Sequence, residues 1–95
     1  MPVAMMQTME GVTTEMYDAV NAKVNEGGPP DGLILHTAGV VDGQMRVVDV
    51  WESQEQHDRF RDERLLPAIR EVAGDEAAEG PPQQEWWDLH DMIKP

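Results

Sequence analysis

The sequence predicts an α+β domain whose elements follow the order β-α-β-β-α-β. Two segments carry apolar residues at helical spacing, and an Asp-Gly dipeptide marks a tight hairpin near the middle of the chain. On either side of that hairpin the pattern is the same: a strand, a helix, a loop rich in Gly and Pro, and another strand. A chain of 95 residues is long enough for one such domain, which we expect to span residues 1–95.

The first half begins with Val3–Met9, which is mostly apolar with weak alternation and suits a buried strand. Thr13 or Thr14 then offers an N-cap hydroxyl to the free backbone N–H groups of a helix. Apolar residues recur every fourth position on one face of that helix: Met16, Val20 and Val24. The loop 27–32 ends the helix, and a second strand is predicted over Leu33–Val40.

Asp42 and Gly43 fit the two central positions of a type I′ turn, which both require positive φ. The turn joins the second strand to a third strand over Met45–Glu52 and fixes their register. In this register His36 faces Asp49, Ile34 faces Trp51 and Ala38 faces Val47.

Ser53 and Gln56 match the capping-box pattern and predict the start of a long helix that ends near Val72 or Ala73. The apolar side of this helix consists of Phe60, Leu65, Leu66, Ile69 and Val72. Pro67 lies inside the helix and lacks a backbone N–H, so we expect a kink or a short break just before it, after Leu66.

An acid-rich loop over Gly74–Pro82 leads to the last predicted strand, Gln84–Ile93. Right-handed crossovers in both halves give a four-stranded antiparallel sheet with both helices on one face, which is the ferredoxin-like fold. Trp86 and Trp87 are neighbours on the last strand, so they point to opposite faces, one of which no helix covers. The uncovered face and the thin core predict a homodimer that packs sheet against sheet.

The charge of the chain excludes several classes of partner. Lys and Arg number 7 against 19 Asp and Glu, for a formal charge of −12. Nucleic acids and anionic membrane surfaces are therefore poor partners, and no apolar run approaches the ~20 residues of a spanning helix. The chain has no Cys, hence no disulfide and no thiolate, and we expect it in the cytoplasm.

The run Arg-Val-Val-Asp-Val-Trp-Glu-Ser over 46–53, with Glu55 and Phe60, resembles the antibiotic biosynthesis monooxygenase-like family of dimeric α+β barrels. The segments 32–36 and 89–93 carry the same likeness, which extends over nearly the whole chain. The resemblance implies a homodimer whose two sheets form a barrel with the helices outside. Known activities of the family include cofactor-free oxygenation of aromatic polyketides and haem degradation, and many members have no assigned role.

The residues argue against the haem-degrading branch of that family. This branch uses an Asn on the first strand, a Trp on the second helix and a His near the end of that helix. The corresponding helix positions hold Phe60 and Arg70, and the first strand has no Asn. Without an axial His we expect no haem, and we predict no other cofactor.

His36 and Asp49 are the candidate catalytic residues. Facing side chains on neighbouring strands come close enough to hydrogen-bond, and a carboxylate that orients an imidazole is half of a general-base arrangement. The simpler interpretation is a structural ion pair that lines the barrel. We place the opposite face beneath the helices, with Leu33, Leu35, Val48 and Val50. Because the family's pockets lie between sheet and helices, either this register is off by one or the pair serves the dimer.

The candidate residues for an apolar ligand pocket are Tyr17, Trp51, Phe60, Trp87 and His90. A cofactor-free oxygenase needs a pocket that desolvates an acidic phenol, with a base or donor such as Tyr17 or His36 at its edge. The alternative is that these aromatic residues form only core and dimer contacts. A metal site of His36, Asp49 and His90 has no supporting spacing motif, so we predict no metal. His57, early on the long helix, is expected at the solvated surface.

Two classes of function therefore remain open. The first is a small-molecule enzyme, either a cofactor-independent monooxygenase or a related isomerase or cyclase, that acts on an apolar aromatic molecule. The second is a non-catalytic homodimeric barrel that binds a small ligand or serves as an accessory subunit. The family likeness and the His36–Asp49 pair favour the first class, whereas the absence of a dense catalytic motif favours the second.

Overall fold

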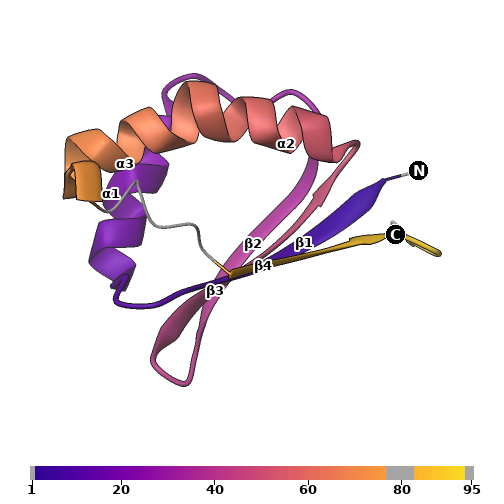
Figure 1. The fold of residues 1–95 in the computed structure, drawn as a ribbon, viewed down its shortest axis with the longest axis horizontal. Helices are drawn as coiled ribbons and strands as arrows, with labels where there is room; N and C mark the ends of the chain where they lie inside the picture. Colours follow the sequence, from indigo (N-terminus) through magenta and orange to yellow (C-terminus); the bar gives the residue numbers. More distant parts are fainter. Residues whose placement is uncertain (1, 77–82, 94–95) are drawn as a thin grey trace.

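The computed structural model describes residues 2–76 and 83–93 and shows the predicted ferredoxin-like arrangement. The four strands form one antiparallel sheet in the order β2-β3-β1-β4, with the helices on one side of it (Figure 1). The strands are β1 (Val3–Met9), β2 (Leu33–Val41), β3 (Gln44–Trp51) and β4 (Gln83–Asp88). The helical segments are α1 (Thr14–Asn25), α2 (Gln54–Phe60), the π-helical turn η1 (Arg61–Leu65) and α3 (Leu66–Ala73).

The β2–β3 hairpin has the predicted turn and, over most of its length, the predicted register. Asp42 and Gly43 have φ values of 52° and 76°, as a type I′ turn requires. His36 pairs with Asp49, and Ala38 pairs with Val47. A β-bulge between Leu33 and Leu35 then shifts the pairing, so that Leu33 faces Trp51 in place of the predicted Ile34.

The structure reverses the predicted assignment of the two sheet faces. Every second residue of β3 is buried beneath the helices: Met45, Val47, Asp49 and Trp51. Leu35, Val48 and Val50 lie on the opposite face, where Leu35 is 53% exposed, and Leu33 pairs with Trp51 across the bulge. The prediction followed the aliphatic residues, but the large indole of Trp51 decides which face is buried. Asp49 shares that face because the site described below satisfies its carboxylate.

Two hydroxyl caps begin the helices where the sequence predicts. The Thr13 hydroxyl accepts a hydrogen bond from the backbone N–H of Met16 at 3.1 Å. The Ser53 hydroxyl accepts one from the backbone N–H of Gln56 at 3.2 Å and donates to the Gln56 side-chain oxygen at 2.9 Å. Gly32, with φ +90°, leaves room for this side chain, because a Cβ there would lie 2.5 Å from Gln56 Cδ.

The expected break at Pro67 takes the form of a wider helical turn just before it. The helix runs without interruption from α2 through η1 to α3, and the backbone N–H of Leu66 bonds to the carbonyl of Arg61, five residues earlier. Because Pro67 has no N–H and its ring crowds the preceding turn, the π-helical turn accommodates it without ending the helix.

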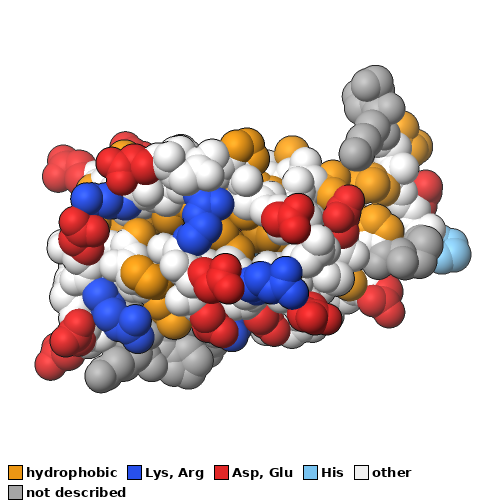
Figure 2. Space-filling model, turned by 90° about the horizontal axis from the view of Figure 1, so that it is seen from above, with side chains coloured by type: hydrophobic (Ala, Val, Ile, Leu, Met, Phe, Trp, Pro, Cys, Tyr) orange, Lys and Arg blue, Asp and Glu red, His pale blue; other side chains and the backbone are white. Residues whose placement is uncertain are grey.

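Arg64 connects this long helix to the end of α1. Its Nη2 donates hydrogen bonds to the carbonyl of Val24 and, at 2.7 Å, to that of Gly28. The guanidinium also lies 5.5 Å from the centroid of the Phe60 ring. Nearby, Lys23 and Glu71 form an ion pair at 2.7 Å. Acidic and basic side chains are interspersed on this helical side, which is consistent with a solvated surface (Figure 2).

The last strand is shorter than predicted, since β4 ends at Asp88 and does not reach Ile93. The backbone N–H of Leu89 still bonds to the carbonyl of Pro2, at 3.0 Å. The predicted acidic loop falls largely on residues 77–82, which lie outside the described residues. Within the described part of the chain, no helix is long and apolar enough to cross a membrane.

Candidate functional site

Four side chains from α1, β2 and β3 form a continuous hydrogen-bonded chain on the helix-covered face. The Tyr17 hydroxyl hydrogen-bonds to His36 Nε2, and His36 Nδ1 lies 2.6 Å from Asp49 Oδ1. The indole N–H of Trp51 donates to the other carboxylate oxygen, Asp49 Oδ2, at 3.2 Å. The hairpin register brings His36 and Asp49 together, and α1 adds the phenol from above the sheet.

The carboxylate of Asp49 is the buried end of this chain. Asp49 is 6% exposed, and both of its oxygens have partners, as a carboxylate removed from water requires. The side chain of His36 is 35% exposed, so the imidazole lies between the buried carboxylate and the surface. The arrangement therefore orients an imidazole at the edge of the sheet by a buried carboxylate.

The pKa values of His36 and Tyr17 are both raised. The hydrogen bond that His36 donates to the Asp49 carboxylate raises the pKa of His36 above its ordinary value, although partial burial opposes this effect. Burial raises the pKa of Tyr17, and the negative charges of Asp49 and Asp18 raise it further. Tyr17 thus stays a neutral phenol, which donates to Nε2 when neutral His36 carries its proton on Nδ1 toward Asp49.

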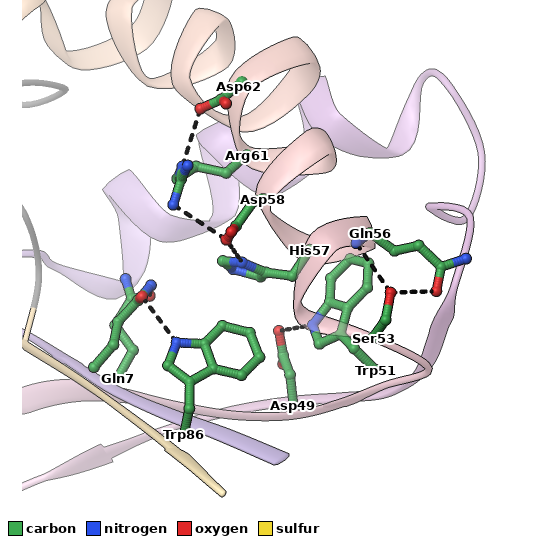
Figure 3. Close-up of polar contacts among 11 residues, drawn as sticks. Gln7, Asp49, Trp51, Ser53, Gln56, His57, Asp58, Arg61, Asp62 and Trp86 are labelled. Atoms are coloured by element: carbon green, nitrogen blue, oxygen red, sulfur yellow. Dashed lines mark hydrogen bonds and ion pairs between the residues drawn. The ribbon is translucent and has the colours of Figure 1, made fainter. Parts of the chain in front are cut away.

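An aromatic cluster continues from Trp51 beneath α2 (Figure 3). The His57 ring meets the Trp51 indole edge to face at 5.3 Å and the Trp86 indole at 4.8 Å, measured between centroids. Phe60 packs against Trp51 at 5.5 Å. His57 Nδ1 lies 3.1 Å from the Asp58 carboxylate. The predicted pocket residues Trp51 and Phe60 are therefore in contact here.

The predicted position of His57 at the solvated surface is wrong, because this residue is only 2% exposed. Its position three residues before Phe60 places both side chains on one helix face, which is a signal that the sequence contained. The neighbouring acidic and basic residues obscured that signal. Asp58 and Arg61, which pair at 3.3 Å, are half-buried next to the His57 ring.

Trp87 and His90 do not join the cluster. Trp87 is 45% exposed on the sheet face that no helix covers, whereas its neighbour Trp86 occupies the helix-covered face. The indole N–H of Trp86 donates to Gln84 at 3.2 Å, and Gln84 in turn donates to Gln7 at 2.9 Å. His90 is exposed and lies beyond the end of β4. The sequence prediction named Trp87 and not Trp86, because alternation alone does not say which face the helices cover.

Two hollows of the surface lie away from the Tyr17–His36 pair. One of about 150 Å³ is lined by Pro30, Asp31, Gln56, Arg59, Phe60, Glu63 and Arg64. A second, of about 420 Å³, lies between the end of α1 and α3, beside Lys23 and Pro67. In the described residues, no three His, Asp or Glu side chains gather closely enough to hold a metal ion.

No protein-family model and no curated protein matches this chain. Among solved structures it is similar to the protein Rv0793 of Mycobacterium tuberculosis, with a TM-score of 0.68 and 15% identity over 99% of this chain and 100% of that one. A provisionally named antibiotic biosynthesis monooxygenase from Chloroflexus aurantiacus has a TM-score of 0.66 and 16% identity, covering 99% and 98% of the two chains. A variant of SnoaB, a cofactor-independent oxygenase from Streptomyces nogalater, has a TM-score of 0.61 and 13% identity, covering 99% and 96%.

These similarities establish the fold over nearly the full length of the chain. The protein has the ferredoxin-like α+β fold that proteins named antibiotic biosynthesis monooxygenases share, as the sequence resemblance implied. At 13–16% identity the likeness concerns the fold and does not assign a function.

Proposed function

We propose that this protein is a cofactor-independent oxygenase of the antibiotic biosynthesis monooxygenase-like family that acts on an apolar hydroxyarene. The observation that carries this proposal is the hydrogen bond of 2.6 Å between His36 and Asp49, because it supplies an oriented base beneath the helices. SnoaB, which shares the fold, is named a cofactor-independent oxygenase.

In the proposed reaction His36 takes the proton of the ligand hydroxyl, and Asp49 stabilises the imidazolium that forms. The resulting arenolate is electron-rich enough to reduce O₂ directly. One oxygen atom becomes a new ring carbonyl in place of a C–H bond, and the other leaves as water with the two hydrogens removed from the substrate. Oxygen itself is the oxidant, so the balance requires no further reductant. The raised pKa of His36 suits this role, since it makes the imidazole a stronger base.

The test is oxygen uptake with a panel of neutral aromatic compounds, beginning with the hydroxyarene 1-naphthol and with anthrone, which is the keto tautomer of a hydroxyarene. We expect His36→Gln to reduce the rate by a factor of about 10²–10⁴, the usual contribution of a general base. His90→Gln is the matched control and should leave the rate unchanged, because His90 is exposed beyond β4. Equal rates in the two variants would refute the role of His36.

One observation favours the second candidate, a non-catalytic homodimeric barrel that binds a small ligand or serves as an accessory subunit. Neither of the two hollows described above borders Tyr17, His36 or Asp49. Under this alternative, hydroxyarenes bind at the site without any oxygen uptake, so binding and uptake measured on the same samples separate the two functions.

We also propose that the uncovered sheet face binds a second copy of this chain. Leu35 and Trp87 are large apolar side chains exposed on this face, next to Val48 and Val50. The face also has self-complementary charge. Within the described residues the Nε of Arg46 is buried without a hydrogen-bond partner, and the exposed Glu85 lies on the same face two strands away. Two copies face to face can pair these residues reciprocally.

A further inference from the structure

Tyr17 occupies the one ring nitrogen of His36 that an outside ligand could use. Nδ1 is turned toward the buried Asp49, and Nε2 is hydrogen-bonded to the Tyr17 hydroxyl. While Tyr17 holds this position, neither nitrogen is available as a base. A ligand hydroxyl can therefore give its proton to His36 only if Tyr17 leaves Nε2 or relays that proton.

We propose that the Tyr17 side chain is an internal stand-in for the ligand, and that a neutral hydroxyarene displaces its phenol from His36 Nε2. This inference rests on the proposed function in two respects, namely that His36 contacts the ligand and that the ligand is a hydroxyarene. It adds that the ligand enters uncharged and that it opens the site by displacing Tyr17.

The geometry around His36 defines what the site recognises. The Tyr17 and His36 rings are nearly parallel, with 12° between their planes and 6.2 Å between their centroids. The phenol thus combines a flat aromatic surface with a hydroxyl donor aimed at Nε2, which is the chemistry of a hydroxyarene. A ligand hydroxyl replaces the lost hydrogen bond with one of the same kind, so displacement leaves no nitrogen unpaired.

Tyr17 is able to leave because it lies at the less buried end of α1. It is half-buried, and its neighbours in the first turns, Met16 and Asp18, are exposed. The buried residue of this helix, Val24, lies near the other end. A rotation of the Tyr17 side chain toward solvent therefore exposes His36 without unfolding the helix.

The charges around the site select against anionic ligands. Asp18 and Asp49 both act on the Tyr17 hydroxyl, and they are among the causes of its raised pKa. The chain as a whole carries a formal charge of −12. A carboxylate on the ligand would add negative charge to a site that already disfavours a phenolate, so the ligand is expected to enter uncharged.

The composition of the chain makes the displacement directly observable. Tyr17 is the only Tyr, so ¹³C labelling of tyrosine rings gives signals from this residue alone. We expect titration with 1-naphthol to move these signals to the values of an exposed tyrosine, with a saturable change at His36 and none at the exposed His90. Naphthalene, which lacks the hydroxyl, and 1-naphthoate, which is anionic, should bind at least tenfold more weakly. Saturation by 1-naphthol with unchanged Tyr17 signals would overturn the inference, as would equal binding of 1-naphthoate.

Two variants sharpen the test. Tyr17→Phe keeps the ring but removes the competing hydrogen bond, so 1-naphthol should bind about threefold to tenfold more tightly. Unchanged or weaker binding, including no measurable binding, would show that Tyr17 does not compete and would overturn the inference. Asp18→Asn leaves Tyr17 in place and should improve the binding of 1-naphthoate relative to 1-naphthol; an unchanged ratio would contradict the electrostatic part of the argument.

Failure of this inference differs from failure of the proposed function. If oxygen uptake is absent but 1-naphthol displaces Tyr17, the oxygenase function is wrong and the stand-in role is supported. If uptake depends on His36 but Tyr17→Phe weakens binding or lowers the rate, the oxygenase function stands and Tyr17 is a proton relay, which contradicts displacement.

Discussion

At the scale of single residues, the carboxylate of Asp49 holds the site together. One oxygen accepts the indole N–H of Trp51, and the other faces Nδ1 of His36, so a single buried group fixes two rings from neighbouring positions of the sheet. Trp51 in turn contacts His57 and Phe60 from α2. A change at Asp49 should therefore be felt first in the ionisation of His36.

The first prediction concerns the substitution Asp49→Asn. It removes the charge but keeps the shape of the side chain, so the pKa of His36 should fall, because the hydrogen bond that raises it is weakened. A histidine NMR titration measures this change, with His90 in the same spectra as an internal reference. If His36 titrates identically in both proteins, the pairing does not exist in solution.

The second prediction concerns the dependence of stability on pH. The folded protein binds the His36 proton more tightly than the unfolded chain, whose pKa is about 6.5. The pair therefore contributes its full stabilisation below that pH, and the contribution is lost as the pH rises through the higher folded pKa. Urea unfolding of the wild type and His36→Gln should show a larger difference in free energy at about pH 5.5 than at about pH 8.5. A larger difference at the alkaline pH would reverse the sign and contradict the raised pKa.

The third prediction concerns the buried ring of His57. His57→Ala leaves a cavity between the indoles of Trp51 and Trp86, and we expect it to lower the free energy of unfolding by about 2–4 kcal/mol. His90→Ala, at an exposed position, should change it by less than about 0.5 kcal/mol. Chemical denaturation of both variants decides the matter; a small loss in His57→Ala would mean that the ring does not fill the core.

The contacts of single residues differ in how far the sequence predicts them. The His36–Asp49 contact was predictable because a two-residue turn fixes the register by local backbone geometry. The Tyr17–His36 contact depends on how α1 lies over the sheet, which neither the turn nor the helix periodicity determines. Which sheet face the helices cover decides two further points, namely that His57 is buried and that Trp86, not Trp87, joins the aromatic cluster.

At the scale of elements, local signals were sufficient for nearly every helix and strand. Caps at Thr13 and Ser53 and the type I′ turn are backbone motifs that a few neighbouring side chains decide. Pro67 predicted an irregularity in the long helix. The hydrogen-bond pattern of η1, however, depends on the whole helix and was seen only in the structure.

The fourth prediction tests the cap of the long helix. Ser53→Ala removes the hydroxyl that accepts from Gln56, which should lower the free energy of unfolding by about 1 kcal/mol. Ser53→Asp supplies another cap acceptor and should retain most of the stability. Circular dichroism followed through urea unfolding compares the three proteins, and equal stability of wild type and Ser53→Ala would mean that the cap contributes nothing.

At the scale of the whole molecule, the fifth prediction is that the protein is a homodimer through its uncovered sheet face. Light scattering after gel filtration should give twice the chain mass of 10.7 kDa at micromolar concentration. Leu35→Asp places a charge on this face and should give monomers. The control is Val40→Asp, because Val40 is similarly exposed but lies on the opposite face of the sheet.

A charge exchange makes the dimer test more specific. Arg46→Glu alone should weaken the dimer, and the double variant with Glu85→Arg should restore it if these residues pair between copies. A wild-type protein that stays monomeric would refute the interface. A dimer that Leu35→Asp does not affect would place the contact elsewhere.

The anchoring of α1 has a mechanical consequence. Three contacts hold the last turns of this helix in place: the hydrogen bonds of Arg64, the burial of Val24 and the Lys23–Glu71 ion pair. Tyr17, in contrast, lies in the first turns. The helix is thus fixed to the rest of the fold mainly at its C-terminal end, and Tyr17 lies near its N-terminal end. Thermal motion should grow along it from Val24 toward Thr14, and the first backbone amides should exchange with solvent hydrogen fastest. The Tyr17 side chain, which the ligand displaces in our proposal, therefore lies where its movement disturbs the fold least.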